Sequence, residues 1–430
     1  MKIIDADFKF NPVGQGSFYT GKLEIGFNSR NQFNFVFDCG TISDRNNLRI
    51  ARNNFKSNLN SKLLNILFIS HLDDDHVNGI KELLNGIICN DVYMPYLTPF
   101  ERLIVSVRHK PKDTNNLDNF INFIKSPHNY LFDDKSEVRK ITYIKGNSDN
   151  KISDDKNPKE TPDNENLNYE FTDSLEPLSP EEFNAEMVTL AQDSKVVFKK
   201  ANGKLKIGNI WEFYLYNEPA SEVQISQFIS SINDIYGITI DKQLSQSDLI
   251  IILDNKNKLK VLRDKFKEIF KNLNKTGLLV QHKPLSYRYG KLFKENQLFR
   301  NEILHFFNFF LRRFRDYIYT VRNRTNNWGV TLLTGDIGLN QIENSVYIKN
   351  NLKYVKIFQV PHHGSKTGWD NNFLKRLNNK GLTSSVINFG YGNTYGHPKP
   401  NVLKDLLNDN HDIRFCNQFE SFEYQIKLYF

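Results

Sequence analysis

The chain has 430 residues, of which 39% are hydrophobic and 25% charged, a balance typical of a soluble globular protein and not of a disordered one. Its 57 lysines and arginines against 49 aspartates and glutamates give a net charge of +8, which favours anionic partners only mildly, because a lysine-rich source proteome would give the same value. No apolar run approaches the roughly 20 residues that span a bilayer, and the first residues lack a secretory signal pattern. We therefore expect a cytoplasmic protein without a membrane segment, and three cysteines, too few for a disulfide framework, agree with that.

Residues 1–95 alternate between strand and helix patterns. Residues 33–38 (FNFVFD) alternate weakly in polarity, and residues 64–70 (LNILFIS) form a short apolar run bounded by polar residues, which predicts a buried strand. Residues 77–84 have helical spacing.

Residues 96–325 are expected to be a large mixed insertion. Residues 146–170 are acidic with almost no large apolar side chain, so we expect a flexible loop there. Residues 204–217 alternate like a hairpin. Residues 292–322 predict a long, aromatic and basic helix, whose phenylalanines would pack in a core or meet a partner, and whose arginines would bind nucleic acid or face solvent.

Residues 326–430 return to strand and helix alternation, which predicts a layered α/β architecture. The expected elements are strands at 329–333, 354–360, 384–389 and 424–430 and helices at 371–378 and 400–408.

The strongest chemical signal is the sequence HLDDDH at residues 71–76, directly after the predicted strand 64–70. It places His71, Asp73, Asp75 and His76 within six residues. Imidazole and carboxylate together suit divalent metals such as zinc or manganese. The alternative is a solvated turn that caps the following helix, but a cap needs one acid and not three acids with two histidines.

Three further polar sets also follow apolar strands. Asp336 follows VTLLTG, His362 and His363 follow VKIFQVP, and His397 lies in the loop GNTYGHP. Each alone would more often be structural. Together with HLDDDH they make a dinuclear metal site the most economical hypothesis.

The motifs HLDDDH, LLTGD, HHGSKT and YGHPKP, in this order, resemble the metallo-β-lactamase fold, and more narrowly the hydrolase domain of the DNA-uptake protein ComEC and its free-standing relatives. VGQG at 13–16 and FDCG at 37–40 also match the opening strands of that branch. The match covers residues 8–95 and 326–410. It implies an α/β fold, a four-layer αββα sandwich in which residues 1–95 and 326–430 form the two halves.

The chain departs from the resemblance at several positions. Asp73 stands where most of the superfamily has histidine, which is usual in the ComEC-like branch and shifts preference toward manganese. Ser17 stands where the branch commonly has aspartate. No residue matches the third superfamily histidine, for which four histidines in the middle segment are weak candidates: His109, His128, His282 and His305.

The resemblance implies specific roles for the metal ligands. His71 and Asp73 would hold the first metal ion, Asp75 and His76 the second, and Asp336 would bridge both. His363, in preference to His362, would complete the ligand shell of a metal ion, and His397 would be a further ligand or a contact of the substrate phosphate. Asp38 would accept a hydrogen bond from the second ring N–H of a histidine, and Asp75 would orient the attacking hydroxide.

Ser365 and Lys366 would contact a phosphate.

Three functional hypotheses follow. The first is a phosphodiesterase, foremost a nuclease, that attacks with a hydroxide bound between two metal ions. The second is a small-molecule hydrolase acting on a cyclic nucleotide, a phosphocholine ester or a lactam-type ring. The third is an effector of an antiviral defence system, which a protein partner docked on the insertion would trigger.

Overall fold

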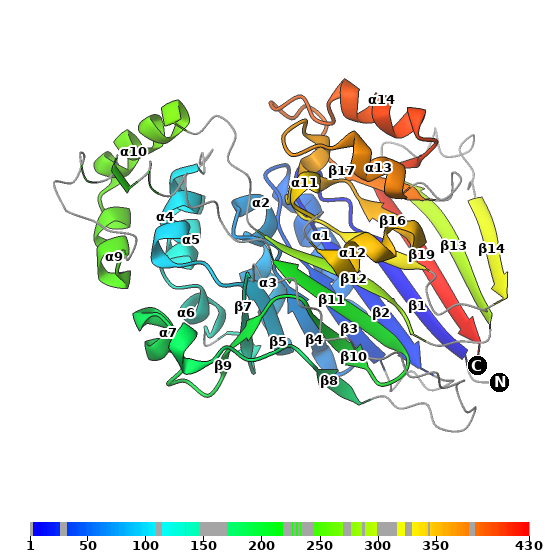
Figure 1. The fold of residues 1–430 in the computed structure, drawn as a ribbon, viewed down its shortest axis with the longest axis horizontal. Coiled ribbons are helices and arrows are strands. Elements are labelled where there is room, and N and C mark those ends of the chain that lie inside the picture. Colours follow the sequence, from blue (N-terminus) through cyan, green and yellow to red (C-terminus); the bar gives the residue numbers. More distant parts are fainter. Residues whose placement is uncertain are drawn as a thin grey trace.

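The computed structural model of the protein describes residues 3–429 apart from residues 26–31, 109–113, 134, 147–169, 218–225, 227–228, 231–232, 234–243, 270–276, 286–288, 299–315, 323–328, 343–344 and 378–382. The described chain forms two sheets with helices outside them (Figure 1), which confirms the predicted α/β class. Among the described helices none is both long and apolar enough to cross a bilayer.

The first sheet is mixed, and its members from β3 to β9 run parallel to one another. In spatial order its strands are β14 (Asp316–Arg322), β13 (Tyr289–Leu298), β19 (Glu420–Tyr429), β1 (Ile3–Phe10), β2 (Tyr19–Ile25), β3 (Gln32–Phe37), β4 (Leu63–Phe68), β5 (Ile88–Pro95), β7 (Ile141–Lys145) and β9 (Val196–Lys200), with β6 (Glu137–Val138) beside β5. Strand β1 shows strict alternation, with every second side chain buried against the other sheet.

The second sheet runs parallel from β15 to β18 and antiparallel elsewhere. Its strands are β18 (Asp412–Cys416), β17 (Ser384–Asn388), β16 (Val355–Gln359), β15 (Val330–Leu333), β12 (Leu278–Pro284), β11 (Trp211–Asn217), β10 (Gly203–Ile207) and β8 (Phe171–Asp173). Strands β15, β16 and β17 are buried on both faces, as expected when helices cover one face and a sheet the other, whereas the edge strand β18 is partly exposed.

Three separate apolar cores define the layers. One core lies between the two sheets. The second joins the outer face of the first sheet to the helices α1 (Arg45–Ser57), α3 (Ile80–Leu84), α4 (Pro99–Arg108), α5 (Thr114–Lys125), α6 (Pro127–Leu131), α7 (Ala185–Leu190), α9 (Gln246–Asp254) and α10 (Lys256–Ile269). The third joins the outer face of the second sheet to α11 (Leu339–Ile342), α12 (Val346–Asn351), α13 (Asn371–Leu377) and α14 (Pro400–Asn408). Four layers in the order αββα result, as predicted (Figure 1).

Residues 96–325 contribute strands to both sheets. Strands β7 and β9 extend the first sheet, and β8 and β10 to β12 lie in the second. The predicted hairpin 204–217 is confirmed, since β10 and β11 pair antiparallel with Leu205 opposite Phe213. All but the end residues of the predicted loop 146–170 lie outside the described part of the chain. The division into two halves and an insertion stays a prediction.

The predicted helix 292–322 was wrong at both described ends. Strand β13 pairs with β19 over its whole length, and β14 pairs with β13. Residues 299–315, which include Arg312 and Arg313, lie outside the described residues. The free edge of β19 offers a row of backbone hydrogen-bonding groups, and pairing with it outweighs the local preference for helix.

We expect the core between the sheets to depend on Phe213 of β11. Its ring lies 4.9 Å from that of Phe35 and 5.5 Å from that of Phe68, and it is fully buried. Phe213→Ala should lower the free energy of unfolding by about 3–5 kcal/mol in denaturant titrations. Val188→Ala, at an exposed position, is the control and should change it by less than about 0.5 kcal/mol. Equal effects of the two substitutions would contradict the assignment of this core.

Candidate metal centre

The predicted site residues lie where parallel strands end. Asp38 follows β3 and the loop 70–76 follows β4 in the first sheet. Asp336 follows β15 and the turn Pro361–Gly364 follows β16 in the second sheet. Within each sheet the two strands are parallel, so their carboxyl ends meet at one edge, where α/β proteins usually place their sites.

A first group of donors consists of His71, His76 and Asp336, whose ligand atoms lie within 4.8 Å of one another. Nε2 of His71 is 3.6 Å from Oδ2 of Asp336, and Nε2 of His76 is 3.5 Å from Oδ1. All three side chains are buried, and both Nε2 atoms are without a hydrogen-bond partner among the described residues. Buried polar nitrogen atoms without partners are costly, so this arrangement indicates a site for a cation.

A second group consists of Asp75, His76 and His363, again with ligand atoms within 4.8 Å. His76 belongs to both groups, so the two candidate metal positions adjoin. The short helix α2 (Asp74–Val77) carries Asp75 and His76. The predicted pair Asp75 with His76 lies together in this group, whereas His71 is grouped with His76 and Asp336 and not with Asp73.

Asp38 and Ser70 orient two of the histidines. The backbone N–H and the hydroxyl of Ser70 both donate to the carboxylate of Asp38, each at 2.7 Å. Nδ1 of His76 lies 2.7 Å from the same carboxylate and must carry the proton, because an ionised carboxylate only accepts. The Ser70 oxygen, 2.8 Å from Nδ1 of His71, is left to accept from it. Nε2 of each histidine is thereby available to a metal ion.

Asp38 takes the position predicted for it, as acceptor of the second N–H of a histidine. Ser70 was not predicted to have a role, although it stands directly before His71. Asp38 adopts a left-handed backbone conformation (φ 59°), as do His362 (φ 51°) and His363 (φ 55°). Strained backbone of this kind concentrates at functional sites.

The hydrogen bonds of His363 indicate whether a cation fits the second group of donors. Its Nδ1 is 2.8 Å from the backbone oxygen of Asn388, which only accepts, so Nδ1 carries the proton. Its Nε2 then faces Oδ2 of Asp75 at 3.0 Å. A lone pair opposite a carboxylate is repulsive unless a proton or a metal ion supplies positive charge. Imidazole nitrogen and carboxylate oxygen are donors that zinc and manganese accept, so the residues fit such an ion.

The electrostatics of the centre agree with a cation site. Burial lowers the pKa of His71 below its usual range. Burial alone would also lower the pKa of His76, but Asp38 and two further carboxylates raise it well above the usual range. Burial alone would raise the pKa of Asp75, but His76 and His363 lower it well below its ordinary value. The centre therefore holds negative charge and attracts a positive partner.

Asp73 lies at the rim of the centre. Its Oδ2 is 3.7 Å from Nε2 of His71. Both of its oxygens also contact Nη2 of Arg108, the last residue of α4, with Oδ2 at 2.6 Å. No pattern in the sequence relates Arg108 to Asp73, because the two belong to different elements.

His362 and His397 lie at the rim as well. Nε2 of His362 is 3.9 Å from Oδ2 of Asp336, and its side chain is 24% exposed. The ring of His397 lies 5.8 Å from that of His362 and stacks on Tyr395. Of the histidine pair, His363 belongs to a donor group and His362 does not.

The other predicted residues occupy varied positions. Ser365 is buried and accepts a hydrogen bond from the backbone N–H of Thr367, whereas Lys366 is exposed. His282, a candidate third histidine, lies between the two sheets with Nε2 2.9 Å from the Tyr19 hydroxyl, and burial lowers its pKa to about 3.

Of the remaining candidates for the third histidine, His128 is partly buried beside Ser126. His109 and His305 lie outside the described residues.

Two glycines of the sequence motifs, Gly335 and Gly40, allow the loops that carry the candidate ligands to lie close to one another. Gly335 has φ +54°, and a Cβ atom there would lie 2.8 Å from the Ser70 hydroxyl oxygen. A Cβ atom on Gly40 would lie 2.7 Å from the backbone oxygen of Asp75. Side chains at these positions would push the ligand-bearing loops apart.

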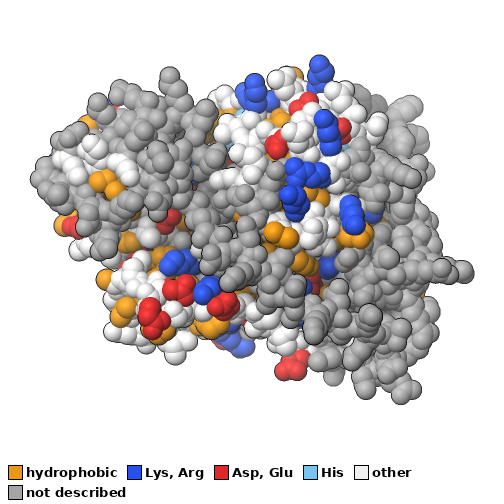
Figure 2. All heavy atoms as spheres, in the orientation of Figure 1, with side chains coloured by type: hydrophobic (Ala, Val, Ile, Leu, Met, Phe, Trp, Pro, Cys, Tyr) orange, Lys and Arg blue, Asp and Glu red, His pale blue; other side chains and the backbone are white. Residues whose placement is uncertain are grey.

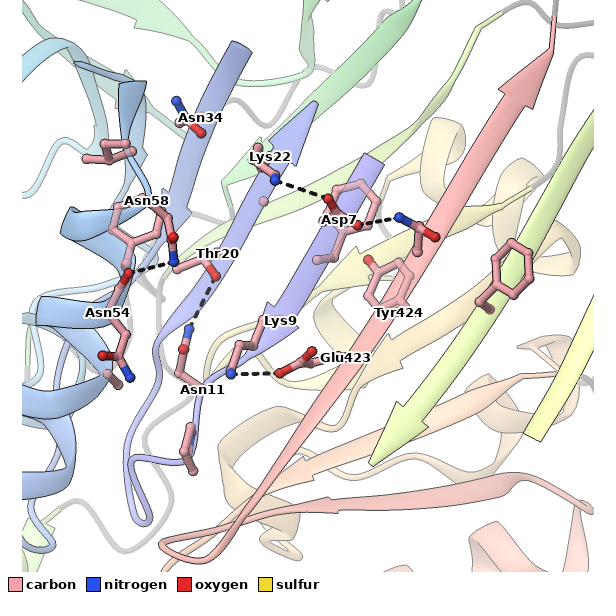
Figure 3. A pocket seen from close by; sticks show the side chains of 18 of the residues that line it. Asp7, Lys9, Asn11, Thr20, Lys22, Asn34, Asn54, Asn58, Glu423 and Tyr424 are labelled. Carbon is pink, nitrogen blue, oxygen red and sulfur yellow. Dashed lines mark hydrogen bonds and ion pairs between the residues drawn. The ribbon is translucent and has the colours of Figure 1, made fainter. Parts of the chain in front are cut away.

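A cavity of about 780 Å³ lies elsewhere, against the strands β1, β2 and β19 and the helix α1 (Figure 3). Two ion pairs lie in its wall: Lys9 lies 2.7 Å from Glu423, and Lys22 lies 3.3 Å from Asp7. None of the predicted site residues lines it.

Comparison with known proteins gives little beyond this geometry. No family model matches the chain, and no curated protein matches it. Among solved structures, it is similar to the crystal structure of the metallo-beta-lactamase fold protein YhfI from Bacillus subtilis, at 8% identity over 98% of this chain and 99% of that one, with a TM-score of 0.35. A likeness this weak adds no support to the ComEC-like assignment, which stays a prediction.

Removing the charge of Asp38 should weaken metal binding. In Asp38→Asn an amide replaces the carboxylate that accepts from Ser70 and His76, so the orientation of His76 is lost. We expect zinc or manganese affinity, measured by calorimetry, to fall about 10–100-fold. Asp118→Asn, in an exposed ion pair, is the matched control. Wild-type affinity in Asp38→Asn would show that this carboxylate does not organise the ligands.

Metal binding near neutral pH should release a proton. The raised pKa of His76 leaves this side chain protonated without metal, and a ligand nitrogen must give up its proton. Affinity should therefore rise with pH until the pH passes that raised pKa. Calorimetry in two buffers of different ionisation enthalpy measures the release, and equal heats in both buffers would contradict it.

Proposed function

We propose that the protein is a metal-dependent hydrolase of the metallo-β-lactamase fold and the ComEC-like branch. The observation that carries the proposal is the convergence of three Nε2 atoms and two carboxylates, from His71, His76, His363, Asp75 and Asp336, on one edge of the sandwich. The order of the sequence motifs and the αββα layers support the same assignment.

The two groups of donors would hold two divalent ions, zinc or manganese. His71, His76 and Asp336 would hold one, with Asp73 at the rim. Asp75 and His363 would hold the other, because Nε2 of His76, which belongs to both groups, has one lone pair and can bind only one ion. Bound there, such ions would supply Lewis-acid catalysis and would lower the pKa of water. Asp336 would hold the first of these ions, since its Oδ2 lies 3.6 Å from Nε2 of His71 and its Oδ1 lies 3.5 Å from Nε2 of His76. The bridging role implied for Asp336 by the sequence motifs stays a prediction.

The residues of this chain would do the remaining work. Asp38 and Ser70 hold His71 and His76 in one tautomer, so that their Nε2 atoms are fixed before substrate arrives. Asp75 has an ionised carboxylate that is 16% exposed, so it can orient an attacking water by accepting a hydrogen bond from it. His362 and His397 lie at the rim, where the leaving group or a phosphate would be.

A phosphodiester, foremost nucleic acid, is the substrate that the charge distribution favours. Figure 2 shows Lys and Arg side chains gathered over α12 to α14. Exposed lysines on these helices include Lys349, Lys375 and Lys404. A cationic surface beside the end of β16 would guide a polyanion toward the site, and the binding would weaken as salt rises.

A small-molecule hydrolase is the second candidate. The deep burial of His71, His76 and Asp336 favours it, because only the rim of the site is partly exposed. A protein partner and a role in defence stay predictions.

The proposed hydrolysis can be tested with Asp75→Ala and His71→Ala. Zinc- or manganese-loaded protein is assayed on single- and double-stranded DNA, on RNA and on bis-p-nitrophenyl phosphate. Both variants should fall to the rate of buffer alone and keep the wild-type circular dichroism spectrum, because His71 lies on a loop and Asp75 on a one-turn helix, both after the end of β4. His128→Ala, which removes an imidazole elsewhere, should keep wild-type turnover.

Wild-type turnover in Asp75→Ala on every substrate would overturn the site assignment. A nucleic-acid rate that falls steeply with salt favours the first candidate, since small neutral substrates give no such dependence.

A further inference from the structure

Arg108 is a cation placed at the rim of the candidate metal centre. It ends α4, which packs in the outer core of the first sheet, so the backbone that carries it is fixed. Its guanidinium reaches Asp73, and Asp73 in turn lies 3.7 Å from His71. One carboxylate therefore separates Arg108 from a metal ligand.

The contact with Asp73 occupies only part of the guanidinium. A single nitrogen, Nη2, meets both carboxylate oxygens. An arginine has five N–H donors, and Nε and Nη1 of Arg108 are without a hydrogen-bond partner among the described residues. The side chain is 23% exposed, so part of it is accessible to a ligand at the rim of the site.

The surroundings favour an anion as that ligand. Asp73 holds Nη2 and so fixes the plane of the guanidinium, which lowers the entropy lost when the remaining donors bind. The fork of an arginine matches two oxygens of a phosphate, whereas a lysine acts only as a point charge. The deepest residues of the centre, His71 and Asp336, are 4% and 2% exposed, so an ester that reaches them must pass the rim.

We propose that Arg108 binds a non-bridging oxygen of the substrate phosphate and thereby selects anionic phosphoesters over neutral esters and lactams. The inference rests on the proposed hydrolase function for the chemistry, and on the Arg108–Asp73 contact for the position. Asp73 would then have two roles, because it both faces His71 and orients the guanidinium of Arg108.

Phosphate binding tests the proposal without turnover. Inorganic phosphate is titrated into zinc-loaded wild type, Arg108→Gln and Arg108→Lys, with metal content measured in each. Arg108→Gln should bind phosphate at least about tenfold more weakly at equal metal content, because a charged hydrogen bond is lost. Arg108→Lys should recover part of the affinity. Arg139→Gln removes an exposed arginine outside the site and should match wild type.

Two outcomes would overturn the proposal. One is phosphate affinity in Arg108→Gln equal to that of wild type. The other is a loss of metal from both Arg108 variants, since Arg108 would then act only by placing Asp73.

The substrate arm uses bis-p-nitrophenyl phosphate and an oligonucleotide as anions and p-nitrophenyl acetate as a neutral ester. Arg108→Gln should raise KM for every phosphodiester that wild type cleaves, with KM for the neutral ester unchanged. A rise for the oligonucleotide alone would place Arg108 on a polyanion surface and contradict the proposal. If wild type cleaves no phosphodiester yet its phosphate affinity depends on Arg108, the proposed function fails and anion binding at Arg108 stands.

Discussion

The centre depends on one buried carboxylate. Asp38 accepts hydrogen bonds from the backbone and the hydroxyl of Ser70 and from His76, and it is fully buried in doing so. These contacts fix the loop after β4 against the end of β3 and pass through Ser70 to His71. A buried charge with several donors is tolerated, whereas the same charge without them would be expelled or protonated.

Both sheets contribute residues to the candidate metal centre. The first sheet supplies His71, Asp75 and His76, and the second supplies Asp336 and His363. The apolar core between the sheets holds the two strand edges in register, so the distances at the centre are set by packing as much as by the loops. Outer helices cover part of the other face of each sheet.

Sequence reasoning worked where a signal was local. The loop 71–76, the strands β15 to β17 and the helix α14 follow from short patterns of apolar and polar residues. Strand β13 could not be predicted, because its partner β19 is distant in sequence and decides its conformation. The contact between Arg108 and Asp73 could not be predicted either, because the two residues belong to different elements. The grouping of Asp75 with His76 follows from their adjacency, whereas His71 is grouped with His76 and not with Asp73, whose carboxylate contacts Arg108.

The spacing of the ligands along the chain has a consequence for how the molecule comes apart. Asp75 and His363 are 288 positions apart and touch across the seam between the sheets. A bound ion would cross-link these two distant segments and would stabilise the folded state. The fraction of protein with bound metal would then determine how long the folded protein resists proteases. Loss of the ion would therefore both abolish the proposed activity and make the chain susceptible to proteolysis.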